Sequence, residues 1–270
     1  MRTLVQLSDL HFGAIDARLL EPLRRRIVAI APDLVVVSGD LTQRARSRQF
    51  REARAFLDSL PKPQLVVPGN HDVPLYNVFR RFFAPLDGYR RYISPDLEPA
   101  YLDDEIAVVG VNTARSLAFK GGRINEEQVA RVRGVLCDLP EAMTKLVVTH
   151  HPFDTPDHWD DAHAVAGRAA MALKALADCG ADVYLSGHLH RAHSGEPTVP
   201  FDIGGVTALM VSAGTATSTR ERGEANAFNT LRIESRHILV EHYEWSEAAG
   251  EFSLARANAF RSMREGWRRA

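Results

Sequence analysis

The side chains in this sequence that are able to do chemistry gather in five short polar clusters, each directly after an apolar run typical of a β-strand. The clusters read SDLH, SGDL, GNHD, THHP and GHLH. They contain Asp9, His11, Asp40, Asn70, His71, His150, His151, His188 and His190. Six of the eleven histidines lie in these clusters, a concentration that random placement along 270 residues rarely produces. We therefore treat the clusters as parts of one site.

The residue types favour metal binding. Imidazole nitrogen and carboxylate or amide oxygen are ligands of Mn, Fe, Zn and Co, and no cysteine competes within the clusters. In DLH and HLH the polar residues are two positions apart, so a locally extended backbone would point both to one side and the leucine to the core. The candidate ligands are Asp9, His11, Asp40, Asn70, His150, His188 and His190. Seven are too many for one tetrahedral ion and suit two ions with a shared ligand.

Turn formation is the alternative explanation of the stretch VVPGNHDVP. Asn and Asp readily bond their own backbone in turns, and Gly supplies a positive φ. A single GNHD would therefore indicate only a turn. The similar clusters after the other strand candidates favour the metal site.

The elements that must position these clusters alternate between strand and helix periods, which is typical of an α/β fold. We expect strands in 3–11, 33–40, 63–72, 106–113, 145–152 and 181–190, and helices in 19–31, 48–60, 125–139 and 167–180. Loops beyond the carboxyl ends of such strands converge on one edge of the sheet. Three further strand candidates, 205–214, 229–236 and 237–245, lack intervening helices and predict an antiparallel part. One domain with a mixed-sheet core follows.

Composition narrows the function classes. The chain is 45% hydrophobic and 25% charged, with a formal net charge of -1, which disfavours a nucleic-acid polymer as partner. The N-terminus lacks the apolar core of a signal peptide, and no run approaches the ~18 apolar residues of a spanning helix. A cytoplasmic location is the expectation. Cys137 and Cys179 lie within predicted helices without a CxxC pair, so we interpret them as small buried hydrophobes rather than a disulfide or a thiolate site.

The motifs DLH, GD, GNHD, HH and GHLH, in this order and over most of the chain, resemble those of the calcineurin-like metallophosphoesterase superfamily. The resemblance implies an α/β fold, a four-layer αββα sandwich of two mixed β-sheets with a dinuclear metal site at the sheet edge. By motif position, one metal is assigned to Asp9, His11 and His190, and the second to Asn70, His150 and His188. Asp40 would bridge both, and the motif position favours His150 over His151 as the ligand.

The resemblance also implies a two-metal hydrolase, in which a metal-bound hydroxide attacks phosphorus. His71 would not bind metal. It would face the phosphate and the leaving oxygen, so His71 and Asp40 are the predicted catalytic residues. Two divalent or mixed-valence ions, Mn, Fe, Zn or Co, are the expected cofactors.

Gln43, in GDLTQRA, separates this chain from two subfamilies. Protein Ser/Thr phosphatases have an Asp there that supports the catalytic histidine, and purple acid phosphatases have a Tyr ligand. The remaining resemblance is to the bacterial branch of class III cyclic-nucleotide phosphodiesterases, glycerophosphodiesterases and nucleotide-lipid pyrophosphatases. We expect a phosphodiesterase acting on small nucleotide or glycerol diesters. The alternatives are a pyrophosphatase cleaving a nucleotide-diphospho-lipid of the UDP-diacylglucosamine type and a non-catalytic scaffold, which the complete ligand set disfavours.

Substrate contacts are predicted less directly. The candidates are Arg44, Asn112, His151 and His193. Segment 76–93 interleaves aromatic residues with four arginines, which would suit a base, a diphosphate or a lipid headgroup. We favour the simpler interpretation, a helix that packs Phe79, Phe82 and Phe83 inward and holds its arginines outward.

We divide the chain into a metallophosphoesterase domain, 1–254, and a C-terminal amphipathic basic helix, 255–270. That helix would present Phe260, Met263 and Trp267 on one stripe and pack on the body, on a partner subunit or, less readily, on a membrane surface. A small-molecule phosphoester is the expected partner. A membrane lipid and a homodimer stay open.

Overall fold

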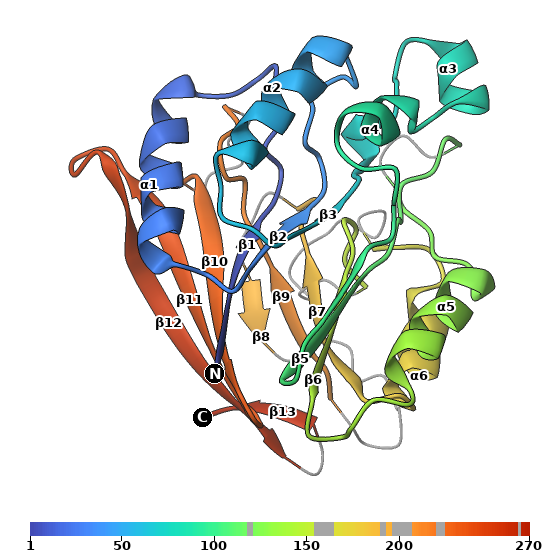
Figure 1. Ribbon diagram of the computed structural model, residues 1–270, viewed down its shortest axis with the longest axis vertical. Helices are drawn as coiled ribbons and strands as arrows, with labels where there is room; N and C mark the ends of the chain where they lie inside the picture. Colours follow the sequence, from blue (N-terminus) through green and yellow to red (C-terminus); the bar gives the residue numbers. More distant parts are fainter. Residues whose placement is uncertain (118–120, 154–164, 190–192, 196–206, 220–224, 264–265) are drawn as a thin grey trace.

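The computed structural model shows two β-sheets packed face to face and flanked by helices on both outer sides (Figure 1). It describes the chain except for residues 118–120, 154–164, 190–192, 196–206, 220–224 and 264–265. The predicted four-layer αββα sandwich of two mixed sheets is confirmed.

The first sheet has the order β13-β12-β11-β10-β1-β2-β3. In it β1, β2 and β3 are parallel, and β10 to β13 extend the sheet in antiparallel fashion. The strands are β1 (Arg2–Leu7), β2 (Leu34–Ser38), β3 (Gln64–Val67), β10 (Ala227–Glu234), β11 (His237–Ser246), β12 (Glu251–Met263) and β13 (Gly266–Arg269).

The second sheet has the order β4-β5-β6-β7-β9-β8. Its four inner strands are parallel, and β4 and β8 close the two edges in antiparallel fashion. The strands are β4 (Ala100–Leu102), β5 (Ile106–Gly110), β6 (Thr144–Val148), β7 (Ala181–Ser186), β8 (His193–Gly195) and β9 (Leu209–Ser212).

Helices cover the outer faces of both sheets. Beside the first sheet lie α1 (Leu20–Ile30), α2 (Ser47–Asp58) and α4 (Asp87–Tyr92), and α3 (Val78–Phe83) lies farther out, at the rim of the molecule. Beside the second lie α5 (Glu126–Leu136) and α6 (Ala169–Ala177). Two single-turn 3-10 helices, Ala17–Leu19 and Asn70–Asp72, complete the described helices.

Three buried hydrophobic clusters correspond to the three contacts between the four layers. Alternation along the strands builds them, because successive side chains of a strand point to opposite faces. In β2, for example, Val36 packs between the sheets while Val37 packs against the helices of the first sheet. In β6, Val148 packs between the sheets and Val147 packs toward α5 and α6. Both faces of these strands are therefore buried, which anchors the loops at their ends.

The last third of the chain differs from the predicted antiparallel arrangement at β9. This strand joins the second sheet and runs parallel to β7. Its four residues are all buried, with Leu209 and Val211 between the sheets and Met210 under the outer helices. Burial on both faces suits an inner parallel strand, whereas β10 and β11 pair antiparallel as expected.

The predicted C-terminal helix is wrong. Residues 251–263 form β12, which pairs with β11, and Gly266–Arg269 form β13. Phe260 lies opposite Ile238 and Trp267 is 1% exposed, so both aromatics complete the layer between the sheets. Their spacing fits a helical stripe, but the unpaired edge of β11 supplies backbone partners, and the core supplies apolar contacts, that an isolated helix would lack.

Segment 76–93 differs from our favoured interpretation in its phenylalanines and in Arg81, whereas Arg80, Arg90 and Arg91 are exposed as expected. It forms α3 and α4, but Arg81 is 3% exposed whereas Phe79 and Phe83 are 78% and 80% exposed. The Arg81 side chain turns inward because its Nη1 donates to the Pro74 carbonyl, 3.1 Å away. The phenylalanines are left on the outer side of the helix.

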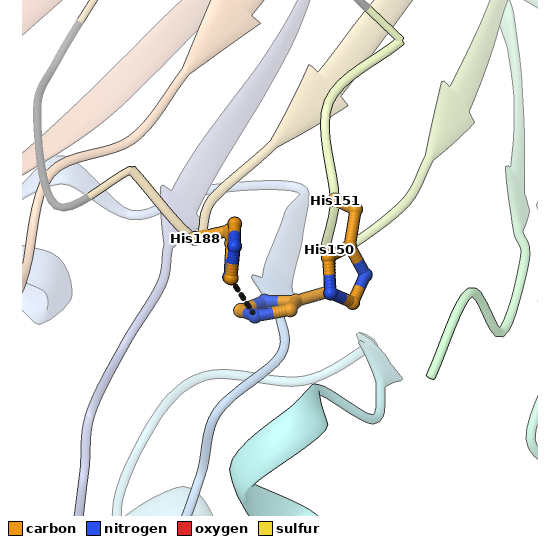
Figure 2. A group of neighbouring side chains, drawn as sticks. All are labelled: His150, His151 and His188. Atoms are coloured by element: carbon orange, nitrogen blue, oxygen red, sulfur yellow. Dashed lines mark hydrogen bonds between the residues drawn. The ribbon is translucent and has the colours of Figure 1, made fainter. Parts of the chain in front are cut away.

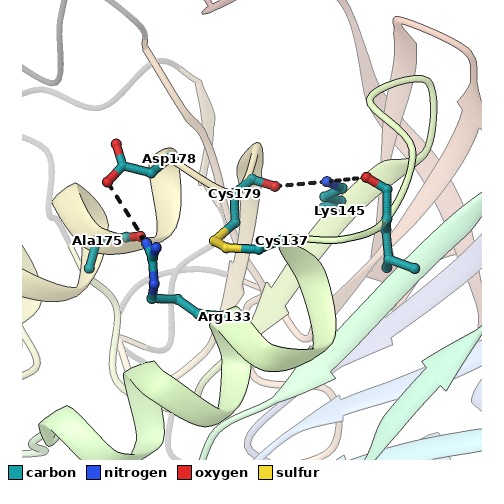
Figure 3. Close-up of a disulfide and its surroundings, with 7 residues drawn as sticks. Arg133, Cys137, Lys145, Ala175, Asp178 and Cys179 are labelled. Carbon is teal, nitrogen blue, oxygen red and sulfur yellow. Dashed lines mark hydrogen bonds and ion pairs between the residues drawn. A yellow bond between two sulfur atoms is a disulfide. The ribbon is translucent and has the colours of Figure 1, made fainter.

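The interpretation of the cysteines is corrected as well. Cys137 and Cys179 form a disulfide that joins the ends of α5 and α6, with their Cα atoms 4.2 Å apart (Figure 3). Beside it, Lys145 Nζ donates to the Cys179 carbonyl at 2.8 Å and to the Leu139 carbonyl at 3.0 Å. No sequence motif marks a pair 42 residues apart; the packing of two helices brings it together.

We expect reduction of this disulfide to lower the free energy of unfolding by about 3 to 4 kcal/mol, because the open chain regains the entropy of a 42-residue loop. Urea unfolding of the wild type with and without dithiothreitol measures the change. The double variant Cys137→Ser/Cys179→Ala is the control and should not respond to reductant. Equal stability of the wild type under both conditions would contradict the expectation.

Among the described residues, no helix combines the length and apolar character needed to cross a bilayer. The cytoplasmic location remains a prediction.

Candidate metal centre

Six of the seven candidate ligands lie together where the carboxyl ends of strands from both sheets meet. Asp9 and His11 follow β1, Asp40 follows β2, Asn70 begins the 3-10 helix after β3, His150 follows β6 and His188 follows β7. The seventh, His190, lies outside the described residues. Asp9, His11 and His150 are fully buried, and Asp40 is 1% exposed. Because the site forms only where loops of both sheets meet, the sequence of any single loop does not reveal it.

The backbone at these residues is left-handed rather than extended. The φ angles are 53° at Asp9, 50° at His11, 53° at Asp40 and 70° at His188. The locally extended backbone predicted for DLH is therefore wrong, although Leu10 is buried as expected. Four non-glycine residues held at positive φ, an unfavourable region for L-residues, mark a place where the surrounding structure imposes the conformation.

Asp40 Oδ2 is the point at which the cluster converges. It is buried and accepts no hydrogen bond from the described residues. The Nε2 atoms of His150, His11 and His71 nevertheless lie 3.4, 3.7 and 4.0 Å from it. Its other oxygen, Oδ1, accepts the backbone N–H of His71 at 2.8 Å. One carboxylate oxygen is thus fixed by the backbone, while the other is left facing imidazole nitrogens on two sides.

A group of ligand atoms lies on each side of Asp40. On one side, His11 Nε2 is 3.5 Å from Asp9 Oδ1. On the other, His150 Nε2 is 3.0 Å from Asn70 Oδ1 and 3.2 Å from His188 Nδ1 (Figure 2). Ligand atoms around a tetrahedral ion with bonds of ~2.1 Å lie ~3.4 Å apart. The spacing on both sides therefore fits a metal ion.

Asp40 and His150 shift each other's pKa. Burial alone would raise the pKa of Asp40, but the positive charge of His150, with His71 and His11, holds that pKa well below its usual range. Burial likewise opposes protonation of His150, but the Asp40 and Asp9 carboxylates outweigh it and raise the pKa of His150 to about 9. The buried carboxylates therefore favour positive charge at this site, which bound cations would supply.

Asp9 is held in its orientation by contacts that the motif analysis did not predict. Ser8 Oγ lies 2.6 Å from Asp9 Oδ2, and the backbone N–H of His188 donates to the same oxygen at 3.0 Å. These contacts leave Oδ1 to face His11. Gly187 permits the close approach, since a Cβ there would collide with Ser8 Oγ. Such supporting contacts are what ligands of a metal require.

The donor set and its geometry fit a dinuclear metal site. One buried carboxylate oxygen without a hydrogen-bond partner among the described residues lies between two groups of N and O ligand atoms. One group combines a carboxylate with an imidazole and the other combines imidazoles with an amide oxygen, donors of the kind that divalent ions take. The residues present would hold two ions with Asp40 between them.

His71 occupies a different position from the ligands. Its side chain is 20% exposed, and its Nδ1 lies 3.0 Å from the Gln43 backbone carbonyl. A carbonyl oxygen only accepts, so Nδ1 carries the proton and Nε2 is the nitrogen directed toward Asp40. Gln43, which replaces the supporting Asp of protein phosphatases, orients the histidine through its main chain.

Asp72, the last residue of GNHD, is a structural clasp that sequence reasoning left without a role. Its carboxylate accepts the backbone N–H groups of Leu41, Thr42 and Gly69 at 2.9 to 3.2 Å, and also the Thr42 hydroxyl. Burial, followed by the charge of Asp40, raises the pKa of Asp72 to about 6. The clasp ties the Asp40 loop to the turn that carries His71.

We expect Asp72→Ala to lower the free energy of unfolding of the metal-free protein by about 2 to 4 kcal/mol, because three buried N–H groups lose their acceptor. Urea unfolding in the presence of a chelator measures this without a contribution from metal. Asp72→Asn keeps one acceptor oxygen and should lose less. A stability equal to that of the wild type would show that the clasp is unimportant.

His151 is fully buried and lies behind the ligands. Its Nδ1 is 2.8 Å from Thr113 Oγ1, and its ring centroid is 4.5 Å from that of His188. Its nitrogen also comes within 4.8 Å of the ligand atoms of His150 and His188. The position matches a supporting side chain better than a substrate contact.

The other predicted substrate contacts are less centrally placed. The Arg44 guanidinium stacks over the Tyr76 ring at 5.7 Å and donates to the Gln43 carbonyl. Asn112 uses its Oδ1 to accept the backbone N–H of Ala114. The main chain of His193 lies in β8, and its side chain falls outside the described part of the structure.

Comparison with known proteins identifies the family of this chain. The sequence profile of the calcineurin-like phosphoesterase family matches residues 2–192. The chain belongs to the calcineurin-like phosphoesterase family.

Individual relatives narrow the comparison. A probable cyclic nucleotide phosphodiesterase of Rhodopseudomonas palustris is 29% identical over 212 residues, 74% of this chain and 76% of the relative. The glycerophosphodiester phosphodiesterase GpdQ of Enterobacter lignolyticus is 31% identical over 166 residues, 55% of this chain and 56% of the relative. The fold resembles a purple acid phosphatase of yellow lupin with a TM-score of 0.71 at 11% identity, covering 96% of this chain and 53% of that one.

Proposed function

We propose that this protein is a two-metal phosphodiesterase acting on small nucleotide or glycerol diesters. The single observation that carries the proposal is the buried Asp40 Oδ2 between the His11 and His150 nitrogens, without a hydrogen bond from the described residues. A carboxylate oxygen in that position suits a bridge between two cations. Isolated, it would be costly to bury.

The proposed ligands divide between two ions. Asp9 and His11 serve the first ion, and His190 would complete its set by motif position. Asn70, His150 and His188 serve the second. Mn, Fe, Zn or Co are the metals that this mixture of imidazole, carboxylate and amide donors suits. Two such ions, when bound, polarise the phosphoryl oxygens and activate a water for in-line attack.

His71 acts on the substrate rather than as a ligand of the metal ions. Its Nδ1 proton is held by the Gln43 carbonyl, so Nε2 is the atom that faces the substrate, and it carries a proton to donate toward a phosphoryl or leaving oxygen when the ring is protonated. The partial exposure of His71, in contrast to the buried Asp9, His11, Asp40, Asn70 and His150, suits a residue that touches substrate. In the protonated state both ring nitrogens donate, which favours negative charge developing nearby.

The choice of substrate class rests on the relatives. One is named a probable cyclic nucleotide phosphodiesterase and another a glycerophosphodiester phosphodiesterase. Both names describe enzymes that act on phosphate diesters of small molecules. With a near-neutral net charge, the chain offers no general attraction for a polyanionic polymer, which favours a small diester.

A second candidate is a pyrophosphatase acting on a nucleotide-diphospho-lipid. The observation that favours it is the exposed aromatic side of α3, close in sequence to the turn that carries His71. An acyl chain would find apolar contacts there.

The test strips the purified protein with a chelator, restores Mn²⁺, and compares bis-p-nitrophenyl phosphate, p-nitrophenyl phosphate and a nucleotide diphosphate conjugate. We expect the diester to be hydrolysed fastest, and only with metal present. Faster cleavage of the diphosphate would favour the pyrophosphatase. No hydrolysis of any of the three by metal-loaded protein would reject both and support a scaffold.

A further inference from the structure

The exposed apolar side of α3 is a feature that hydrolysis of a small diester does not use. Its side chains form what we call the α3 surface: Tyr76, Val78, Phe79, Phe82 and Phe83, which are 74%, 63%, 78%, 49% and 80% exposed. In Figure 1, α3 lies at the upper right, at the rim of the molecule and away from both sheets. A cluster of large apolar groups on a protruding element indicates an interaction surface.

The α3 surface is held in this orientation by polar contacts of the helix itself. Asn77 Oδ1 accepts the backbone N–H of Arg80 at 2.9 Å and caps the helix. Arg81 turns inward and donates from Nη1 to the Pro74 carbonyl. The rings of Phe79 and Phe83 then lie side by side on the outer face, with centroids 5.3 Å apart. The exposure is therefore a consequence of how α3 is built.

The segment that carries the α3 surface is mostly positively charged. Residues 75–95 contain four arginines and a single acid, Asp87. Arg80, Arg90 and Arg91 are exposed. Exposed aromatics next to exposed cations are the combination that binds the headgroup region of anionic bilayers, where apolar rings insert and cations meet lipid phosphates.

We propose that the α3 surface docks this protein on anionic phospholipid bilayers. Charge decides between this partner and a second copy of the chain. A two-fold dimer joins the same patch of both copies, so the positive charges of Arg80, Arg90 and Arg91 would meet the same positive patch of the other copy. An anionic bilayer neutralises them instead. In Figure 1, α3 lies at the edge of the molecule, where a flat surface is able to approach it.

Docking would bring the metal centre to the lipid surface. The 3-10 helix Asn70–Asp72, which holds His71, comes just before α3 in the chain. The binding proposal itself does not depend on the proposed chemistry, since it can be measured in metal-free protein. Its failure and the failure of the phosphodiesterase proposal are therefore distinguishable.

The test sediments the full-length protein with sucrose-loaded vesicles of phosphatidylglycerol and phosphatidylcholine, 1:1, or of phosphatidylcholine alone. We expect at least ~10-fold stronger partitioning to the anionic vesicles, because the exposed arginines meet lipid phosphates there. Phe79→Ser/Phe83→Ser should reduce binding to anionic vesicles ~10-fold or more, because two rings no longer insert. Arg80→Glu/Arg90→Glu should remove the preference for anionic lipid.

The matched control is Val28→Ser/Leu254→Ser, which alters two exposed apolar residues. They lie on α1 and β12, which are on the left of Figure 1, across the molecule from α3. It should bind vesicles like the wild type. Equal binding of the wild type to both vesicles would overturn the anionic partner, and binding unaffected by the Phe79 and Phe83 changes would overturn the surface. If the wild type stays in the supernatant and those changes convert a dimer to a monomer in size-exclusion chromatography, the occupant is a second copy and the proposal is wrong.

Discussion

Replacing Asp40 with asparagine should remove bound metal and reduce diester hydrolysis by ~10³-fold or more. The side chain is 1% exposed, and its Oδ2 lies within 4.0 Å of three histidine nitrogens. Asparagine keeps an oxygen for the backbone N–H of His71 but replaces the anionic oxygen. Loss of a bridging charge is expected to cost several kcal/mol, each 1.36 kcal/mol being tenfold in rate. Metal content per chain by elemental analysis and turnover with Mn²⁺ measure the two effects.

Asp58→Asn is the matched control for this variant. Asp58 lies at the end of α2, about half exposed, and pairs with Arg54. This change should leave both metal content and turnover within about twofold of the wild type, as surface substitutions usually do. If Asp40→Asn retained two metals and full turnover, Asp40 would not be the bridge and the proposed division of ligands would fail.

Replacing His71 with alanine should reduce turnover by ~10²-fold or more and leave the metal content unchanged. The structure separates the two effects, because His71 Nδ1 is engaged by the Gln43 carbonyl and its Nε2 lies 4.0 Å from Asp40 Oδ2, farther than the Nε2 atoms of His11 and His150. Turnover and metal content, measured on the same preparation, give both quantities. His237→Ala, at an exposed histidine of β11, should change neither.

The leaving group reveals which task His71 performs. p-Nitrophenolate departs without a proton, whereas an alkoxide needs one. If His71 protonates the leaving oxygen, the deficit of His71→Ala should be larger for a glycerol diester than for bis-p-nitrophenyl phosphate. Equal deficits would assign it to the phosphoryl charge instead. Full activity of the variant, or loss of its metals, would contradict the role altogether.

The elements of the core were readable from the sequence because their patterns are local. In β2 every residue is apolar or small, β6 ends in the apolar run Leu146–Val148, and both strands are followed by a polar cluster. α1 and α5 repeat their apolar positions at the helical period. These patterns concern neighbours in the chain, so burial on one or both faces shows in the order of residues. The αββα architecture additionally required the family resemblance.

The gathering of the candidate ligands was predictable in outline for the same reason. Each cluster follows a strand, and the carboxyl ends of parallel strands meet at one edge. The residue types Asp, His and Asn then indicated a metal. The contacts that orient them were not predictable: the His188 N–H on Asp9, the Gln43 carbonyl on His71 and the Asp72 clasp all depend on the meeting of separate loops.

What the sequence by itself determined, then, is the alternation of strands and helices and the set of chemical groups at the strand ends, because both are written in local spacing. Only the tertiary structure decided whether 255–270 became a helix or the strands β12 and β13, which side of α3 faced outward, and that Cys137 met Cys179. The left-handed backbone at Asp9 and Asp40 belongs to the same class. In each case the local pattern permits two outcomes, and contacts with residues distant in the chain supply the free energy that selects one.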